Sequence, residues 1–326
     1  MAAGRSIDKT DPLDLLDRQD RQDRQGIETL VKPAQFDYYA PRTLEDALRI
    51  LAEAGSEGRV LAGGQSLGPM LNFRLAKPAV IVDINRVEGL GILEAGPSHL
   101  KVGALVRHAA FLRSTQVREG WPILAEATRH VAHMAIRNRG TVCGSICHND
   151  PAAEQPSLLF TLGGIVEIAS AKGRRELPAQ DFLTGMMSNA LEPGEMVVAV
   201  RYPRPVPGTS VGFDEFARRL GDFAIAGAAA TLTVSDGRCS AARLTIIGMG
   251  RGPFRAEAAE AALVGSRLGG SDGEATIAEA VARTVSAVEP AEDVHASAGY
   301  RRHLAGVMAE RALGSARSRA MGGRIG

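Results

Sequence analysis

The feature that most restricts how this chain can fold is a strand that ends in two consecutive glycines. Val60, Leu61 and Ala62 have the composition of a short strand, and Gly63-Gly64-Gln65-Ser66 follows at once. Glycine tolerates positive φ and lets the backbone approach a ligand closely, so successive N–H groups can point at a diphosphate, with the Ser66 hydroxyl as a further donor. Because Gly-Gly is also an ordinary turn signal, a plain turn remains open. Residues 62–66 are called the first loop below.

A second polar stretch, residues 136–154, contains two arginines, a Gly-Ser pair and two acids. It is predicted to be irregular from 138 to 156, and long loops inside compact domains are usually functional. Thr141 and Ser145 can donate to phosphate or ribitol oxygens, and Glu154 can accept from a ribose diol. A surface loop stabilised by Asp-Pro turn chemistry is the alternative. Residues 141–145 are called the second loop.

Overall composition excludes several classes of protein. The chain has 326 residues, 38 Lys and Arg against 37 Asp and Glu, and 45% hydrophobic residues, which disfavours disorder and a basic nucleic-acid-binding surface. No apolar run approaches the roughly 18 residues of a membrane span. The three cysteines cannot form a disulfide framework, and the N-terminus lacks a secretory pattern, so we expect a cytoplasmic protein.

Short helical and strand patterns alternate along the chain, which predicts an α+β protein of small units. Residues 1–32, with Asp-Arg-Gln repeated three times, are predicted to be a flexible extension. The proline-rich segment 201–207 is the predicted linker. The expected units are an N-terminal domain over 33–205 with subdomains at about 33–88 and 89–205, a C-terminal domain over 206–314, and a flexible tail over 315–326.

Individual helices and strands are predicted from hydrophobic periodicity and from residues that typically begin or end such elements. Thr43 is predicted to cap a helix that Gly55 ends. Further helices are expected at 108–112, 123–131, 157–162, 255–263, 274–287 and 294–313, and strands at 80–84, 100–103, 165–168, 195–200, 225–234 and 243–247.

Two other patterns imitate known sites. Cys143-x-x-x-Cys147-His148 could suggest a metal, but zinc sites usually show paired knuckles, and Cys239 lies in another predicted domain. The stretch that begins at Gly248 departs from the dinucleotide fingerprint because its third glycine position holds Pro253. Since no hydrolase or P-loop signature occurs either, we predict no metal site and no catalytic acid, base or nucleophile.

A series of motifs in one order resembles the flavin-binding medium subunit of the molybdenum hydroxylases, the family of xanthine dehydrogenase and aerobic carbon monoxide dehydrogenase. The similarity covers residues 33 to about 313. The motifs are Phe36-Asp37-Tyr38, the stretch 62–70, Val82-Asp83-Ile84-Asn85, the stretches 136–141 and 144–145, Asp150-Pro151-Ala152-Ala153-Glu154, the stretch 218–224 and the stretch 252–256. The resemblance implies an α+β fold: a two-subdomain FAD-binding domain of the PCMH or vanillyl-alcohol-oxidase type, followed by a smaller α+β C-terminal domain.

The resemblance also implies cofactor-binding residues. The FAD diphosphate would lie along Ala62, Gly63, Gly64, Gln65 and Ser66, with Thr141, Val142, Cys143, Gly144 and Ser145 on its other side and at the ribityl chain, Glu154 at the adenosine ribose, and Val197 near the isoalloxazine. Two departures stand out. The family usually has a glycine where this chain has Cys143, whose side chain could crowd the cofactor or point away. Residues 213–216 lack a lysine that relatives often present near the flavin.

The function implied by the resemblance is electron transfer. Iron–sulfur clusters carry one electron at a time, whereas a flavin holds one or two. This chain would therefore pass electrons from the 2Fe-2S clusters of a small subunit through FAD to an external acceptor. A large molybdopterin subunit would hydroxylate an organic, N-heteroaromatic substrate, and two such heterotrimers would form a dimer. The alternatives are a self-sufficient FAD-dependent oxidoreductase and an FAD-free scaffold on the same fold.

Overall fold

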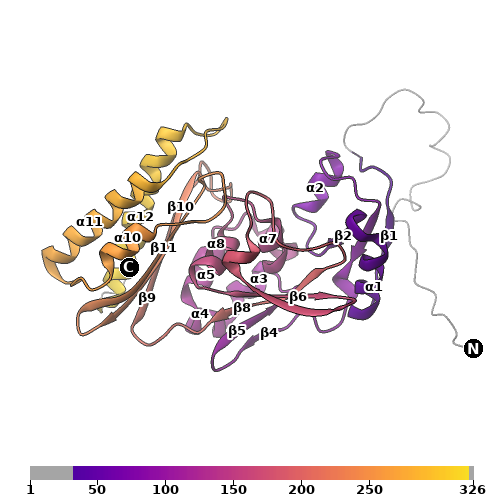
Figure 1. Ribbon diagram of the computed structural model, residues 1–326, viewed down its shortest axis with the longest axis horizontal. Coiled ribbons are helices and arrows are strands. Elements are labelled where there is room, and N and C mark those ends of the chain that lie inside the picture. Colours follow the sequence, from indigo (N-terminus) through magenta and orange to yellow (C-terminus); the bar gives the residue numbers. More distant parts are fainter. Residues whose placement is uncertain (1–31, 323–326) are drawn as a thin grey trace, which may run out of the picture.

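The computed structural model describes residues 32–322, which form three sheets with their helices (Figure 1). All but one residue of the predicted N-terminal extension, 1–32, lies outside the described residues, as do residues 323–326 of the tail.

The first subdomain is a small parallel sheet of order β1-β3-β2. Its helix α1 begins after Thr43, whose Oγ1 accepts from the Asp46 N–H at 3.1 Å, and ends at Gly55, where φ is 54°. Both limits agree with the sequence prediction. Its elements are β1 (Asp37–Tyr39), α1 (Leu44–Ala54), a 3-10 turn (Gly55–Glu57), β2 (Gly58–Leu61), α2 (Leu67–Asn72), β3 (Val80–Asp83) and a 3-10 turn (Ile84–Arg86).

The second subdomain is an antiparallel sheet of order β4-β5-β8-β6-β7, with helices grouped on one side of it in Figure 1. Its core is built from large side chains that are fully buried, among them Trp121, Tyr202 and Phe111. Its elements are β4 (Leu93–Ala95), β5 (His99–Gly103), α3 (His108–Arg113), α4 (Thr115–Gly120), α5 (Pro122–Thr128), α6 (Met134–Arg139), α7 (Val142–His148), α8 (Glu154–Thr161), β6 (Ile165–Ser170), β7 (Gly173–Pro178), α9 (Ala179–Phe182) and β8 (Met196–Pro203).

The C-terminal domain is an antiparallel sheet of order β12-β11-β10-β9, with long helices on one face and α5 and α8 of the preceding domain on the other (Figure 1). Helix α12 can lie close to the sheet because Gly212 has no side chain: a Cβ there would be 2.1 Å from the Ala312 carbonyl oxygen. Its elements are β9 (Thr209–Phe216), β10 (Ala226–Ser235), β11 (Arg238–Ile247), β12 (Phe254–Arg255), α10 (Glu257–Leu263), α11 (Gly270–Ala287) and α12 (Ala298–Ala320).

One buried arginine joins α12 to the strand ends of this sheet. Arg301 Nη1 donates to the carbonyl oxygens of Ile225 at 2.6 Å and Gly248 at 2.8 Å, and its Nη2 donates to Asp293 at 2.7 Å. The side chain of Arg301 is only 8% exposed. Because a buried charge needs partners on all its donors, this arrangement fixes the helix against the sheet.

Three sequence predictions need correction. The stretch 138–156, predicted to be irregular, contains α7, because its glycine and polar residues hid a short capped helix. Strand β9 was missed, and β8 continues into the predicted linker as far as Pro203, at the end of its pairing with β5. The predicted flexible tail is wrong for residues 315–320: α12 continues to Ala320, with Ala316 buried and Arg317 donating to the Leu268 carbonyl at 2.6 Å.

Candidate cofactor site

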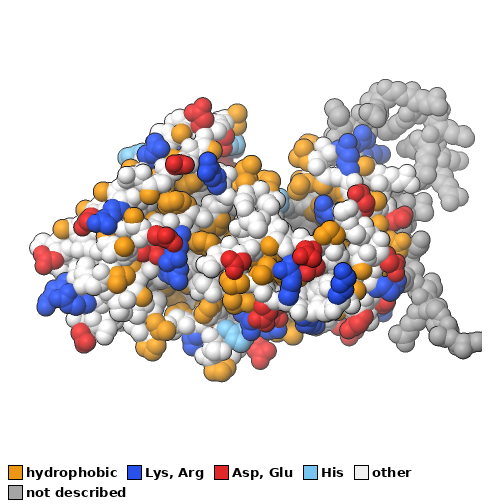
Figure 2. All heavy atoms as spheres, viewed as in Figure 1, with side chains coloured by type: hydrophobic (Ala, Val, Ile, Leu, Met, Phe, Trp, Pro, Cys, Tyr) orange, Lys and Arg blue, Asp and Glu red, His pale blue; other side chains and the backbone are white. Residues whose placement is uncertain are grey.

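A cleft of about 800 Å³ lies where the two subdomains and the C-terminal domain meet. Its walls come from both loops, α2, the stretch 187–197 that leads into β8, and the segment Gly221, Asp222 and Phe223. Figure 2 shows apolar side chains gathered around a notch between the C-terminal domain and the part that contains α2. A cleft of this size with mixed polar and apolar walls is typical of a small-molecule or cofactor site.

The first loop lies directly against the residues that precede the second loop. A Cβ on Gly63 would be 2.5 Å from the Arg139 carbonyl oxygen, 2.7 Å from Gly140 Cα and 3.0 Å from the Thr141 nitrogen. Backbone therefore meets backbone at Gly63. At the next position, Gly64 has a φ of 70°, a backbone conformation that glycine adopts at little cost and other residues rarely adopt. The two glycines were predicted to let the backbone approach a ligand closely, whereas the close approach at Gly63 is between the two loops themselves.

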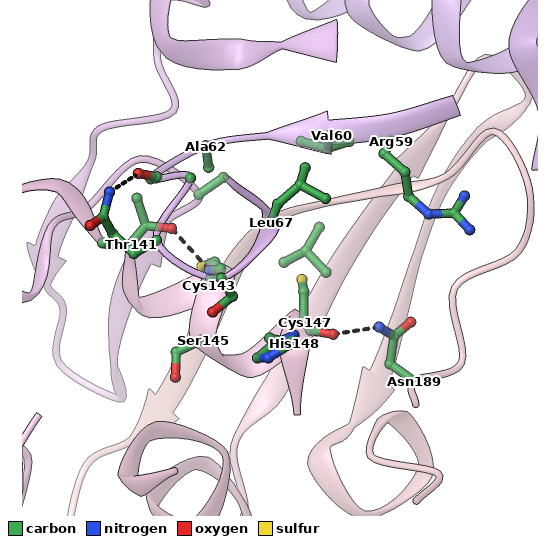
Figure 3. A pocket seen from close by; sticks show the side chains of 18 of the residues that line it. Arg59, Val60, Ala62, Leu67, Thr141, Cys143, Ser145, Cys147, His148 and Asn189 are labelled. Carbon is green, nitrogen blue, oxygen red and sulfur yellow. Dashed lines mark hydrogen bonds between the residues drawn. The ribbon is translucent and has the colours of Figure 1, made fainter. Parts of the chain in front are cut away.

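The second loop is the N-terminus of α7. Thr141 is the N-cap, and its Oγ1 accepts from the Gly144 N–H at 3.0 Å. The loop is also paired with the residues before α3: Thr141 forms an antiparallel bridge with Arg107, and the Val142 N–H donates to the Val106 carbonyl at 3.0 Å. Figure 3 shows Thr141, Cys143 and Ser145 near Ala62 and Leu67 of the facing loop and helix. The helix cap thus fixes the backbone that faces the first loop.

Cys143 is buried, and its thiol donates to the Val102 carbonyl oxygen in β5 at 3.5 Å. Of the two orientations left open by the sequence, the side chain takes the one toward the sheet. Burial raises the pKa of Cys143 well above its usual range and that of Cys147, one turn further along α7, to about 12. Both thiols are therefore protonated and unreactive at neutral pH.

Eleven of the twelve predicted cofactor-binding residues border this cleft, and only Val142 does not. Val142 is the first residue of α7, where its side chain is fully buried in the core. The eleven are Ala62, Gly63, Gly64, Gln65, Ser66, Thr141, Cys143, Gly144, Ser145, Glu154 and Val197. The structure thus brings together residues from four separate parts of the sequence.

Glu154 lies at the boundary with the C-terminal domain. It begins α8 and is buried, and burial together with the nearby Glu215 of β9 raises its pKa well above the usual range of a carboxyl. Glu215 in turn contacts His130, with 3.3 Å between Oε1 and Nδ1. That contact raises the pKa of His130. A protonated Glu154 can donate a hydrogen bond as well as accept one.

Sequence reasoning missed part of the wall. The segment 185–189 is held against α7 by two amides: Asn149 Nδ2 donates to the carbonyls of Gly185 and Ser188, both at 2.8 Å, and Asn189 Nδ2 donates to that of Cys147 at 2.7 Å. Asn149 adopts positive φ of 49°, which asparagine tolerates better than most residues. No periodic signal could have placed this segment at the cleft.

Two ring side chains also border the cleft without having been predicted. His108 is buried, its Nδ1 has no hydrogen-bond partner within residues 32–322, and burial lowers its pKa to about 4, so it is neutral. Phe223 is 66% exposed at the mouth and offers a flat apolar surface. Its position in the stretch 218–224, which the resemblance singled out, was the available signal.

The part of the chain that the structure describes offers neither a metal cluster nor a membrane span. Within that range, His, Cys, Asp and Glu do not gather in any group of three or more that could hold a metal ion. Over the same residues, every helix is too short or too polar to cross a membrane.

The geometry fits an FAD-sized ligand. Gly63 and Gly64 carry no side chain, so the first loop borders the cleft there with its peptide groups. Peptide N–H groups and the Ser66 hydroxyl are the donors that a diphosphate prefers. Val197 and Phe223 add apolar surface that suits a flat ring.

Comparison with known proteins supports the same interpretation. Residues 34–205 match the family model for the FAD-binding domain in molybdopterin dehydrogenases, and residues 212–316 match that for the C-terminal domain of the CO dehydrogenase flavoprotein. The chain is 42% identical over 291 residues to the 6-hydroxypseudooxynicotine dehydrogenase complex subunit alpha of Paenarthrobacter nicotinovorans, covering 89% of this chain and 97% of that protein.

Solved structures agree in fold. A chain of quinoline 2-oxidoreductase from Pseudomonas putida 86 superposes with a TM-score of 0.84 at 39% identity, covering 89% of this chain and 99% of that one. A chain of carbon monoxide dehydrogenase from Hydrogenophaga pseudoflava gives a TM-score of 0.84 at 35% identity, with 88% and 99% covered. The predicted fold class is confirmed. The chain therefore belongs to the family of FAD-binding medium subunits of molybdenum-containing dehydrogenases.

Proposed function

We propose that this chain is the electron-transfer subunit of a heterotrimeric molybdenum hydroxylase. It passes electrons from the 2Fe-2S clusters of a small subunit, through FAD, to an external acceptor. The observation that carries the proposal is the contact of the two loops at Gly63, which lines one continuous cleft with peptide groups from both. When bound, FAD supplies the exchange between single-electron and paired-electron transfer.

The chain's own contribution is binding, orientation and exclusion of water. The first loop and the start of α7 line the cleft, with the Ser66 and Ser145 side chains adding hydroxyl groups. Val197 and Phe223 add apolar surface to its walls. Glu154, buried with a raised pKa, holds a proton at the boundary with the C-terminal domain. None of these roles needs a nucleophile.

For the substrate of the large subunit, we propose an N-heteroaromatic compound. Two of the similar proteins are named for such compounds, a hydroxylated pyridine derivative of nicotine and quinoline, at 42% and 39% identity. The carbon monoxide dehydrogenase is 35% identical. Because substrate contacts in this family belong to the large subunit, this proposal rests on those likenesses alone.

The test is to purify the chain after co-expression with its partner subunits and to record its absorption spectrum. We expect flavin bands, with FAD released in a 1:1 ratio to this chain, and copurification of iron–sulfur and molybdenum proteins. Anaerobic addition of pyridine, quinoline or purine compounds should bleach the flavin in the complex. Bleaching in the isolated chain would instead indicate a self-sufficient oxidoreductase. A colourless protein without partners would contradict the proposal.

Assembly and location complete the proposal. We place the complex in the cytoplasm. The three free thiols support this location, because the cytoplasm keeps cysteines reduced. The dimer of heterotrimers implied by the resemblance is tested by the mass of the purified complex in solution. A mass equal to one copy of each subunit would contradict the dimer and leave the electron-transfer role standing.

A further inference from the structure

Arg107 connects the two loops through its side chain. It precedes α3, and its backbone forms an antiparallel bridge with Thr141. Its Nη1 donates to the carbonyl oxygen of Arg139 at 2.5 Å. Arg139 is the residue whose carbonyl lies against Gly63. One half of the guanidinium is therefore bound to the chain just before the second loop.

The other half reaches the first loop through Asn85. Arg107 Nη2 donates to Asn85 Oδ1 at 2.5 Å, and Asn85 Nδ2 donates to the carbonyl oxygen of Ala62 at 2.8 Å. Asn85 is itself held by Asp83, whose Oδ1 accepts from the Asn85 backbone N–H at 2.9 Å and from its amide at 2.6 Å. The Tyr38 hydroxyl donates to the other oxygen of Asp83 at 2.5 Å. The link between the loops is therefore supported from β1 and β3.

Guanidinium chemistry suits this task. Its donors lie in one rigid plane, so two acceptors bound to it are held at a fixed separation, which a flexible ammonium cannot do. Neither Arg107 nor Asn85 borders the cleft. Both therefore act on a ligand through the loops and not by touching it.

We propose that Arg107, acting through Asn85, is a positioning residue that sets the spacing of the two loops for the diphosphate of FAD. The inference rests on the proposed cofactor site. The spacing is set before the ligand binds, since every contact in the link is made within this chain. Preorganised donors lose less entropy on binding, which raises affinity.

The experiment titrates FAD, and separately ADP, into the FAD-free full-length chain and measures Kd for Arg107→Met, Asn85→Ala, the double variant and Arg107→Lys. Arg113→Met, an exposed arginine at the end of α3, is the matched control. We expect Arg107→Met and Asn85→Ala each to weaken FAD binding about 10- to 100-fold. The affinity for ADP should fall by the same factor, because ADP shares the diphosphate, which is the group that the two loops hold. The double variant should be little weaker than either single one, since both remove the same link.

Other results separate the possible failures. Two results together would overturn the link: wild-type FAD affinity in Arg107→Lys, and no loss of FAD affinity in Asn85→Ala. They would assign the effect of Arg107→Met to the lost charge alone. Unchanged affinity in Arg107→Met would overturn it outright. If Arg107→Met unfolds, Asn85→Ala decides, and thermal unfolding of the FAD-free variants shows whether the loss is confined to binding. A wild-type chain that binds neither FAD nor ADP would contradict the proposed function itself and this inference with it.

Discussion

The two loops of the cleft keep their shape by different means. The first depends on missing side chains, because Gly63 lies against the backbone of residues 139–141 and Gly64 needs positive φ. The second is the start of a helix, shaped by the cap at Thr141 and by a cysteine turned toward β5. Glycine is thus required at 63 by a backbone contact, at 64 by the positive φ, and at 144 by the cap, since a Cβ there would lie 2.6 Å from Thr141 Oγ1. The glycine that relatives usually have at position 143 is not a geometric requirement in this chain.

The strongest challenge to this comparison is Gly63→Ala. The added Cβ would lie 2.5 Å from a carbonyl oxygen that cannot move without displacing the second loop. We expect a loss of about 3 kcal/mol in the free energy of unfolding, typical of overpacking, and loss of FAD from the purified protein. Urea unfolding and flavin content measure the two effects.

The matched control for that variant is Gly68→Ala. An added Cβ at this position in α2 meets nothing within 4 Å, so neither stability nor FAD content should fall. Normal flavin content in Gly63→Ala would show that the loops can separate and still bind.

A smaller effect is expected when glycine is introduced into the second loop. Cys143→Gly removes a buried side chain and places glycine inside α7, which should cost about 1–2 kcal/mol in stability. FAD content should stay the same, because the side chain faces the sheet. Cys143→Ala, which keeps helix propensity, should cost less. An increase of bound FAD in the glycine variant would mean that Cys143 crowds the cofactor after all.

The cap of α7 should contribute about as much as a typical N-cap. Thr141→Ala removes the acceptor for the Gly144 N–H and should lower the free energy of unfolding by about 1 kcal/mol. Thr141→Ser keeps the acceptor and should recover most of the loss. If FAD affinity falls in the alanine variant and returns in the serine variant, the helix start is part of the binding geometry. Equal FAD affinities in the two variants would show that the cap stabilises the helix but does not affect cofactor binding.

A separate effect concerns pH. Burial, Glu215 and Asp150 raise the folded-state pKa of Glu154 above its unfolded value, while Arg137 lowers it. The folded state therefore holds the proton more tightly, and its stability is lost as pH rises from the unfolded pKa of 4.5 to about 8. Glu154→Gln should remove that part of the pH dependence. Unfolding of both proteins between pH 5 and 8 tests this, and parallel curves would show that Glu154 ionises normally.

Much of the first loop was predictable from sequence, because strand endings and paired glycines are local signals. The cap of α1 at Thr43 and its end at Gly55 were predictable for the same reason. The second loop was harder, because the propensities of Gly144 and Ser145 disfavour a helix that is stabilised by its cap and by its packing on α8, β8 and β5.

Long-range contacts were not predictable at all. Nothing in the sequence near residues 185–189 shows that Asn149 will bind their carbonyls, and nothing near Glu154 shows that Glu215 will lie beside it. The family resemblance suggested roles for single residues, whereas the link through Arg107 and Asn85 became visible only once the loops were placed in space.

The contacts of Arg301 mean that the C-terminal helix matters more than its distance from the cleft suggests. A premature stop codon before residue 301 would delete the group that binds the carbonyls of Ile225 and Gly248. Ile225 lies two residues beyond Phe223, at the mouth of the cleft. Such a truncated product would keep every residue of both loops, yet it should be degraded in the cell or purify without flavin.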